Sequence, residues 1–167
     1  EIKSGKIKSH LGKEFTAFDA SFSDLLKKIK RGPAIMLNKD IGEIIAHTGI
    51  TSKSKIVDAG AGSGVLVAHL GKISKNVTSY EKNKEFFNIA KQNLEFLNVK
   101  VRLKNKDIYE GIDETNLNLI TLDLLEPWNV IKHAKKSLAS GGFLVCYVTN
   151  INQVIKTVEN LEGFYLE

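Results

Sequence analysis

The sequence predicts an α/β fold in which an open sheet of parallel strands alternates with helices. Short apolar segments, such as Ile56–Val57 and Leu117–Leu122, are separated by amphipathic segments long enough to form helices. Three glycines at alternate positions, Gly60 to Gly64, follow the first of these apolar segments. Helical connections of this kind join parallel strands through right-handed crossovers, so the order strand, glycine turn, helix indicates the first unit of such a sheet.

The region before the glycine turn predicts a small β segment and two helices. Residues 1–18 alternate charged and apolar side chains without a helical period, so residues 1–20 are expected to be the tail of a small N-terminal β module and a linker. Residues 21–167 then form the main domain. Ser21–Ile29 has apolar residues at helical spacing and ends at the break Lys30–Pro33, and Asp40 is expected to cap a second helix that ends near Gly49.

The rest of the chain continues the alternation. Strands and helices are expected, in chain order, as helix 65–73, strand 77–81, helix 83–97, strand 99–103, strand 117–122, helix 130–138, strand 143–148 and a helix from Asn150 or Asn152. A sixth strand is expected to begin at Phe164–Leu166.

The positive charge is concentrated ahead of the glycine turn. The net charge is +5; residues 1–55 carry eleven Lys/Arg against six Asp/Glu, whereas residues 56–167 carry thirteen of each. A basic flank beside a neutral sheet suits a polyanionic substrate such as RNA. The alternative is a lysine-rich surface that is only solvated.

The composition predicts a cytoplasmic protein. No run of 18 apolar residues occurs, and the first residues do not resemble a signal peptide, so no membrane segment is expected. The single cysteine, Cys146, lies in an apolar segment and is expected to be a reduced residue of the core.

The glycine turn predicts a ligand site. Glycine permits a positive φ and lets a ligand approach the backbone closely. Dinucleotide sites place the third glycine one position later, where Val65 stands here. Gly60, Gly62 and Gly64 behind an acidic residue have the spacing of class I S-adenosylmethionine-dependent methyltransferases, which predicts a Rossmann-like sheet and S-adenosyl-L-methionine as cofactor. A turn without a ligand is the plainer alternative.

Three carboxylates are expected to meet at this turn, because the carboxyl ends of parallel strands lie at one edge of a sheet. Glu81 can accept hydrogen bonds from both ribose hydroxyls of an adenosine ligand. Asp107 can accept a hydrogen bond from the adenine amine, with the backbone of Ile108 nearby. The alternatives are that Glu81 is an exposed charge at the end of a strand and that Asp107 is an ordinary loop aspartate. Asp123 would lie next to the transferred methyl group.

The segment Asp123-Leu-Leu-Glu-Pro-Trp128 is the sharpest local signal. Its proline restricts the loop, and Trp128 offers a flat face at the edge of the site. Ser63 has no histidine partner in the sequence, which argues against a hydrolase. No metal site is expected, because none of the histidines has metal-ligand spacing: His10, His47, His69 and His133.

Together these motifs resemble the tRNA (adenine-58-N1)-methyltransferases, the TrmI family. The segment His10–Phe15 resembles the end of that family's small N-terminal β domain. Two departures are Asn38, where the family has proline, and the end of the chain, which comes two strands before the family's sheet is complete. The resemblance is carried by Gly32-Pro33-x-Ile35, Lys39-Asp40, Asp58–Gly64, Tyr80-Glu81, Asp123–Trp128 and Asn150-Ile-Asn-Gln-Val154.

The resemblance implies methyl transfer from S-adenosylmethionine to N1 of adenosine 58 in the tRNA T-loop, with the neighbouring adenosine as a second candidate. It implies a homotetramer and tRNA as partner, with Asp123 as the catalytic carboxylate. Trp128 is expected to stack on the base, and Lys30, Arg31 and Lys39 to contact phosphates. The residues expected to bind the cofactor are Gly60, Gly62, Ser63, Gly64, Val65, Glu81, Asp107, Ile108 and Asp123.

Two other functions stay open at this point. One is a small-molecule methyltransferase of the precorrin type, although such enzymes have a glycine-rich loop where this chain has Asp123–Trp128. The other is a non-catalytic tRNA-binding subunit of the same fold, although such a subunit is expected to lose glycines or carboxylates that this chain keeps.

Overall fold

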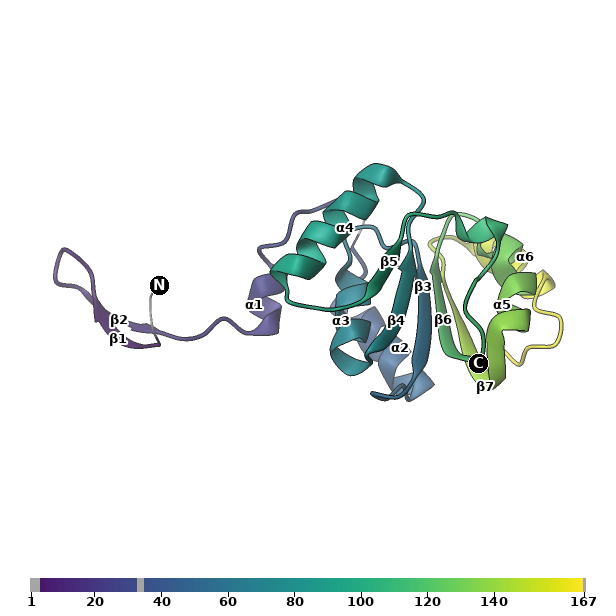
Figure 1. The fold of residues 1–167 in the computed structure, drawn as a ribbon, viewed down its shortest axis with the longest axis horizontal. Helices are drawn as coiled ribbons and strands as arrows, with labels where there is room; N and C mark the ends of the chain where they lie inside the picture. The colour runs from purple at the N-terminus through teal and green to yellow at the C-terminus, as the bar shows by residue number, and fades with distance from the viewer. Residues whose placement is uncertain (1–3, 33–34, 167) are drawn as a thin grey trace.

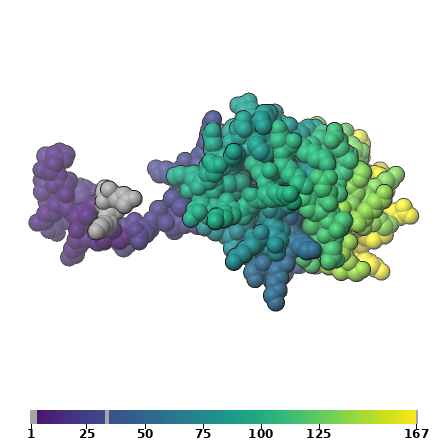
Figure 2. All heavy atoms as spheres, in the orientation of Figure 1, coloured from purple at the N-terminus to yellow at the C-terminus, as the bar shows by residue number. Residues whose placement is uncertain are grey.

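A computed structural model describes residues 4–32 and 35–166. Strand β1 (Gly5–Lys8) pairs with the antiparallel strand β2 (Glu14–Ala17) in a hairpin. This hairpin stands apart from the rest of the chain as an arm (Figure 1), and it stays clear of the body when side chains are drawn (Figure 2). A two-stranded hairpin has no core of its own, and Leu11 and Phe18 are 82% and 84% exposed.

Within the described residues, five parallel strands form the sheet of the body, in the order β5-β4-β3-β6-β7. The chain runs outward from β3 through β4 to β5, then returns to the other side of β3 for β6 and β7. The direction therefore reverses between β3 and β6, which is where open α/β sheets bind their ligands. The strands are β3 (Lys55–Ala59), β4 (Asn76–Tyr80), β5 (Arg102–Lys104), β6 (Leu117–Asp123) and β7 (Leu138–Tyr147).

Helices cover both faces of this sheet (Figure 1). Their sequences carry the expected capping signals: Ser21 and Asp24 form a capping box, Asn83 and Asn150 cap the helices they precede, and Gly49 ends its helix with a left-handed conformation. The helices are α1 (Phe22–Leu26), α2 (Asn38–Thr48), α3 (Val65–Ile73), α4 (Lys84–Phe96), α5 (Ile131–Ser137) and α6 (Ile151–Glu159), with 3-10 turns η1 (Ile108–Glu110) and η2 (Pro127–Val130).

The sheet separates two apolar clusters, because neighbouring residues of a strand point to opposite faces. Ile56 and Leu119 pack with α2, α3 and α4 on one face. Val57 and Ile120 pack with α5 and the two 3-10 turns on the other. Burial on both faces explains why apolar residues stand next to one another in the central strands, as in Ile56–Val57 and Leu119–Ile120, and it confirms the predicted α/β class.

Several predicted boundaries were wrong. Helix α1 stops at Leu26 rather than at Ile29, and the backbone N–H of Lys30 donates to the side chain of Asn93 instead of to a helical carbonyl. Helix α2 begins at Asn38, so Asp40 lies in its first turn and is not its cap. Strand β5 is shorter than predicted and β7 longer. Pro33, part of the predicted break, lies outside the described residues.

The predicted sixth strand is also wrong. Residues 164–166 are not in a strand; the N–H of Phe164 donates to the carbonyl of Leu161 in a turn that follows α6. Cys146 is only half-buried, since β7 is an edge strand, although its burial still raises the thiol pKa to about 12. None of the helices formed by the described residues has the length and hydropathy to cross a bilayer.

Candidate active site

A pocket of about 500 Å³ opens at the carboxyl ends of β3, β4 and β6. This volume lies within the range of small-molecule and cofactor sites. Six of the residues predicted from the sequence line it, and they come from four separate segments of the chain. These are Gly60, Gly62, Glu81, Asp107, Ile108 and Asp123.

The glycine turn forms one wall of the pocket with bare backbone. Gly60, Gly62 and Gly64 all have positive φ values, of 89°, 54° and 81°. A Cβ atom on Gly60 would overlap the carbonyl oxygen of Asp123 on the neighbouring strand. The N–H of Gly60 donates to the carbonyl of Tyr80 at 3.0 Å, which joins the turn to the end of β4. Glycine at position 60 is therefore required by the backbone itself.

Glu81 is buried at the end of β4 and is already oriented. Its Oε2 accepts the N–H of Gly62 at 3.0 Å, and its Oε1 accepts the N–H of Asn83 at 2.9 Å. Each carboxylate oxygen has a further lone pair, so the group can still accept two hydroxyl donors from a ligand. The two remaining acceptor positions match the two hydroxyl donors of a ribose diol.

Asp107 and Ile108 form the part of the pocket next to η1. The Oδ1 of Asp107 accepts the N–H of Tyr109 at 3.0 Å, and its Oδ2 lies 3.5 Å from the Nζ of Lys82. That same Nζ lies 5.1 Å from the centre of the Tyr109 ring. Ile108 is buried and offers an apolar surface of the kind that a nucleobase covers.

Asp123 ends β6 and lines two hollows at once. One is the main pocket; the other is a hollow of about 20 Å³, large enough for roughly one water molecule, between the glycine turn and Met36. Burial raises the pKa of the Asp123 carboxyl above its ordinary value. A partly desolvated carboxylate interacts more strongly with a positive charge than one in water does.

Asp58 lies under the turn, fully buried, and was not predicted as a site residue. Its Oδ2 accepts the hydroxyl of Ser79 at 2.6 Å, and its Oδ1 accepts the hydroxyl of Thr121 at 2.7 Å. Burial raises the pKa of this carboxyl to about 6, despite the two hydrogen bonds, and the nearby charges of Asp123 and Glu81 act in the same direction.

Three of the predicted cofactor residues lie outside the main pocket. Ser63 and Val65 line the small hollow, and the hydroxyl of Ser63 accepts the N–H of Gly32 at 3.0 Å. Gly64 caps α3 and packs near the backbone of Ala90.

The predicted substrate residues are not among the residues that line the two hollows. Trp128 is half-buried in η2, with the Nζ of Lys156 5.0 Å from its ring centre. Lys30 and Arg31 are exposed on the segment that follows α1, and Lys39 is exposed in the first turn of α2, where its Nζ lies 3.9 Å from Oδ1 of Asp40.

Sequence reasoning missed the other residues of the pocket lining. Most of them adjoin predicted residues, so a search of neighbouring positions could have found them. Phe86 was expected as part of the helix 83–97, and it lies in the first turn of α4. The missed residues are Tyr80, Lys82, Phe86, Tyr109, Leu124 and Leu125.

Solved structures share this architecture. An S-adenosylmethionine-dependent O-methyltransferase from Thermotoga maritima matches 95% of this chain and 62% of its own, with a TM-score of 0.84 and 30% identity. The tRNA (m1A58) methyltransferase TrmI from Aquifex aeolicus matches 86% of this chain and 60% of its own, with a TM-score of 0.79 and 26% identity. The fold and its pocket thus define a class I S-adenosylmethionine-dependent methyltransferase.

Sequence comparison narrows this class. The family model described as ribosomal RNA adenine dimethylase matches residues 27–137, so the chain belongs to the adenine methyltransferases of RNA. The tRNA (adenine(57)-N(1)/adenine(58)-N(1))-methyltransferase TrmI of Methanocaldococcus jannaschii is 38% identical over 99% of this chain and 71% of its own length. Within that group the chain is a member of the TrmI family, as its motifs predicted. It spans roughly two thirds of the length of these relatives.

Proposed function

We propose that this protein transfers a methyl group from S-adenosylmethionine to N1 of adenosine 58 in tRNA, with the neighbouring adenosine as a second acceptor. The observation that supports this best is the position of Asp123, which lines the same pocket as Glu81 and the glycine turn. A carboxylate at the edge of a cofactor pocket is suited to hold an acceptor base beside the donor.

The pocket residues fit the proposed cofactor in two respects. The glycine turn leaves backbone accessible where a side chain would fill the space, and Glu81 keeps lone pairs for a ribose diol. When bound, S-adenosylmethionine supplies a methyl group on a positively charged sulfur. We assign Gly60, Gly62 and Ser63 to its methionine part, with Gly64 and Val65 as the start of the helix behind them.

The same reasoning assigns the adenine end of the cofactor. We propose that Asp107 accepts a hydrogen bond from its exocyclic amine and that Ile108 supports the ring, since both line the main pocket and neither lines the small hollow. Binding there requires Lys82 to share or release the Asp107 carboxylate.

Asp123 is proposed as the catalytic carboxylate. Adenine N1 carries an in-plane lone pair, so the enzyme does not need a strong base to generate a nucleophile; it has to orient the base in line with the donor. Asp123 accepts a hydrogen bond from the N6 amine of the acceptor, which aligns N1, and its charge stabilises the positive charge that develops on the ring. The acceptor nucleotide has to leave its stack to reach this pocket.

Methylation of N6 on ribosomal RNA is a second candidate, which the family model supports. That model matches residues 27–137, whereas the TrmI relative aligns with 99% of the chain, so its match also includes β7 and helix α6. The wider match favours N1 of tRNA. The precorrin and non-catalytic alternatives have no comparable support, because the precorrin enzymes among the structural neighbours share 17% and 19% identity and so show the fold alone.

The test is methylation of unmodified tRNA with labelled cofactor, followed by mapping of the modified nucleotide and of the modified ring atom. We expect N1-methyladenosine at position 58, and a loss of turnover of at least about 100-fold in Asp123→Asn, with cofactor affinity retained. Wild-type turnover by that variant would remove Asp123 from its role. N6-methyladenosine as product would favour the ribosomal RNA candidate.

We further propose that tRNA is bound along Lys30, Arg31 and Lys39, with Trp128 stacking on the extruded base. All three cations are exposed, Lys30 and Arg31 after α1 and Lys39 in the first turn of α2, and Trp128 lies in η2 after the Asp123 loop.

Finally, we propose a cytoplasmic homo-oligomer, a tetramer as the family resemblance implies, in which residues 1–20 belong to a separate β module. Light scattering at micromolar concentration tests this; a monomeric mass would exclude it.

A further inference from the structure

The loop that follows Asp123 is held by two side chains from distant parts of the chain. The Nε2 of Gln153, on α6, donates to the carbonyl of Leu125 at 2.8 Å. The hydroxyl of Tyr109, on η1, accepts the backbone N–H of Glu126 at 3.2 Å. Leu125 itself is 80% exposed, so packing of its side chain contributes little to holding the loop.

These contacts begin where the sheet stops supporting the chain. Strand β6 pairs with both neighbours up to Leu122 and with β7 up to Asp123, opposite Tyr147. Beyond Asp123 the segment Leu124–Glu126 has left the strand and lines the pocket with Leu124 and Leu125. Leu124 packs against the cluster of Val57 and Ile120, and the carbonyl of Glu126 accepts the N–H of Asn129, but the carbonyl of Leu125 and the N–H of Glu126 are bonded by side chains of other elements.

Gln153 is fixed in a single orientation. Its Oε1 accepts the backbone N–H of Thr149 at 3.0 Å, the Thr149 hydroxyl at 3.2 Å and the Nδ2 of Asn150 at 2.9 Å. An amide turned by 180° would point its NH2 group at these donors, so only the observed orientation satisfies them. Gln153 is buried, and its amide NH2 must therefore face Leu125.

Tyr109 connects the same loop to the cofactor side of the pocket. Its ring lines the pocket and lies under the Nζ of Lys82, while its backbone N–H donates to Asp107. The loop is thus attached on one side to the residues assigned to the cofactor and on the other to helix α6.

We propose that Gln153 and Tyr109 are positioning residues that fix Leu124–Glu126 and thereby hold the Asp123 carboxylate against the acceptor base. The inference rests on the proposed function only for the identity of the acceptor. Displacement of a catalytic group by about 1 Å can cost roughly 100-fold in rate, so loss of either contact should lower kcat while leaving cofactor affinity unchanged.

The decisive variant is Gln153→Glu. It keeps the oxygen that accepts from Thr149 and Asn150, but it replaces the donor to Leu125 with a second oxygen that repels the carbonyl. Gln92→Glu, on the exposed side of α4, makes the same chemical change away from the site and serves as the matched control. Tyr109→Phe removes only the acceptor for Glu126, with Tyr165→Phe, at an exposed position, as its control.

Two measurements are made on each variant. The first is steady-state methylation of tRNA, from which we expect a fall in kcat of about 10-fold to 100-fold for Gln153→Glu and a smaller fall for Tyr109→Phe, with the dissociation constant of S-adenosylmethionine unchanged. The second is acrylamide quenching of Trp128, the sole tryptophan of the chain, which stands two residues beyond Glu126. We expect quenching to increase in both variants and in neither control.

Wild-type kcat in Gln153→Glu, or quenching equal to that of the wild type, would overturn the inference. A variant that binds the cofactor with wild-type affinity is folded, so a fall in kcat cannot then be ascribed to unfolding. If the wild-type protein methylates no tRNA, the proposed function fails, and the quenching experiment still decides whether the two residues hold the loop.

Discussion

Asp58 has a carboxyl group whose ionisation is opposed by its burial at the site. Its carboxyl is fully buried beneath the glycine turn and accepts two hydroxyl hydrogen bonds, from Ser79 and Thr121. Desolvation nonetheless raises its pKa from 3.8 to about 6. A carboxylate beneath a pocket for a cationic cofactor is useful when the ligand is present and unfavourable when it is absent.

This pKa predicts a pH dependence that Asp58→Asn removes. Between about pH 4 and pH 6 the folded state binds more protons at this group than the unfolded state, so its contribution to the free energy of unfolding falls as the pH rises through that window. The stability of Asp58→Asn relative to the wild type should therefore increase from pH 4 to pH 7, by up to about 3 kcal/mol. Urea denaturation at intervals across this range measures the difference.

Asp19→Asn, at an exposed position before α1, is the control and should leave the pH profile unchanged. Parallel stability profiles for Asp58→Asn and the wild type would mean that the buried carboxyl has an ordinary pKa.

At the scale of elements, one buried residue of helix α4 connects the segment that carries Lys30 and Arg31 to the glycine turn. The Nδ2 of Asn93 donates to the carbonyls of Lys30 and Ser63, at 2.8 and 2.9 Å, and its Oδ1 accepts the N–H of Lys30 at 2.8 Å. Asn93 thus holds the segment after α1 next to the glycine turn, although some thirty residues separate the two in the chain. A buried backbone group that loses its partner is costly.

Asn93→Ala should accordingly lower the free energy of unfolding by roughly 2–4 kcal/mol, since three hydrogen bonds are lost and partly buried backbone groups stay unpaired. Chemical denaturation measures the change, and Gln92→Ala, exposed on the same helix, should alter stability little. Equal stabilities of the two variants would show that Asn93 does not connect these elements.

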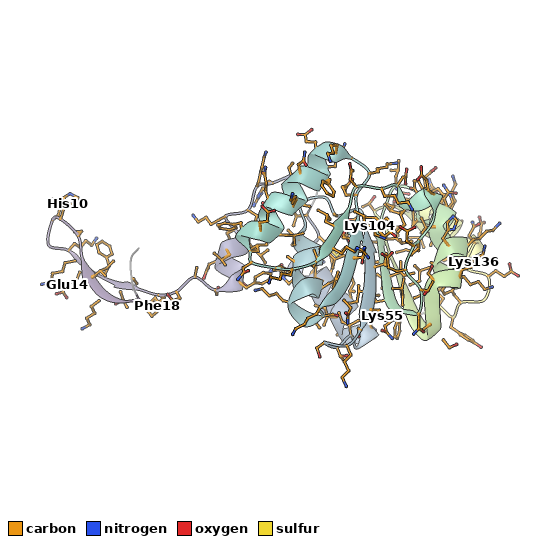
Figure 3. All side chains as sticks on the ribbon, in the orientation of Figure 1. His10, Glu14, Phe18, Lys55, Lys104 and Lys136 are labelled. Carbon is orange, nitrogen blue, oxygen red and sulfur yellow. The ribbon has the colours of Figure 1, made fainter. Side chains whose placement is uncertain are left out.

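At the scale of the whole molecule, the distribution of charge bears on tRNA binding. The excess of positive charge lies ahead of the glycine turn, and Lys30, Arg31 and Lys39 are exposed near the site. Other lysines, including Lys55, lie at the opposite, amino ends of the strands (Figure 3). Phosphate contacts release counterions, so their number appears in the salt dependence of affinity.

Replacement of Lys30, Arg31 and Lys39 by alanine should weaken tRNA binding and reduce the slope of log affinity against log salt by about 2–3. The matched control removes the same charge from the far edge, at Lys53, Lys55 and Lys75, and should change the slope much less. Fluorescence anisotropy at several salt concentrations compares them. An equal slope in both triple variants would mean that Lys30, Arg31 and Lys39 are solvated surface residues that do not contact phosphates.

The sequence by itself determined the alternation of strands and helices, the glycine turn and the strand-end position of Glu81 and Asp123. Hydrophobic period and backbone requirements are local, and α3 was predicted with its exact bounds for that reason. Parallel strands end at one edge, which is why residues far apart in the chain could be expected in one pocket.

Only the tertiary structure decided which side chains meet. Phe86 faces the pocket, Ser63 holds Gly32, Gln153 and Tyr109 hold the loop after Asp123, and Phe164–Leu166 forms no strand. Each depends on the packing of segments that are distant in sequence or on a pairing partner, and no local pattern encodes such a contact. Local propensity sets the elements, whereas the contacts between them follow from how the whole chain buries its apolar surface.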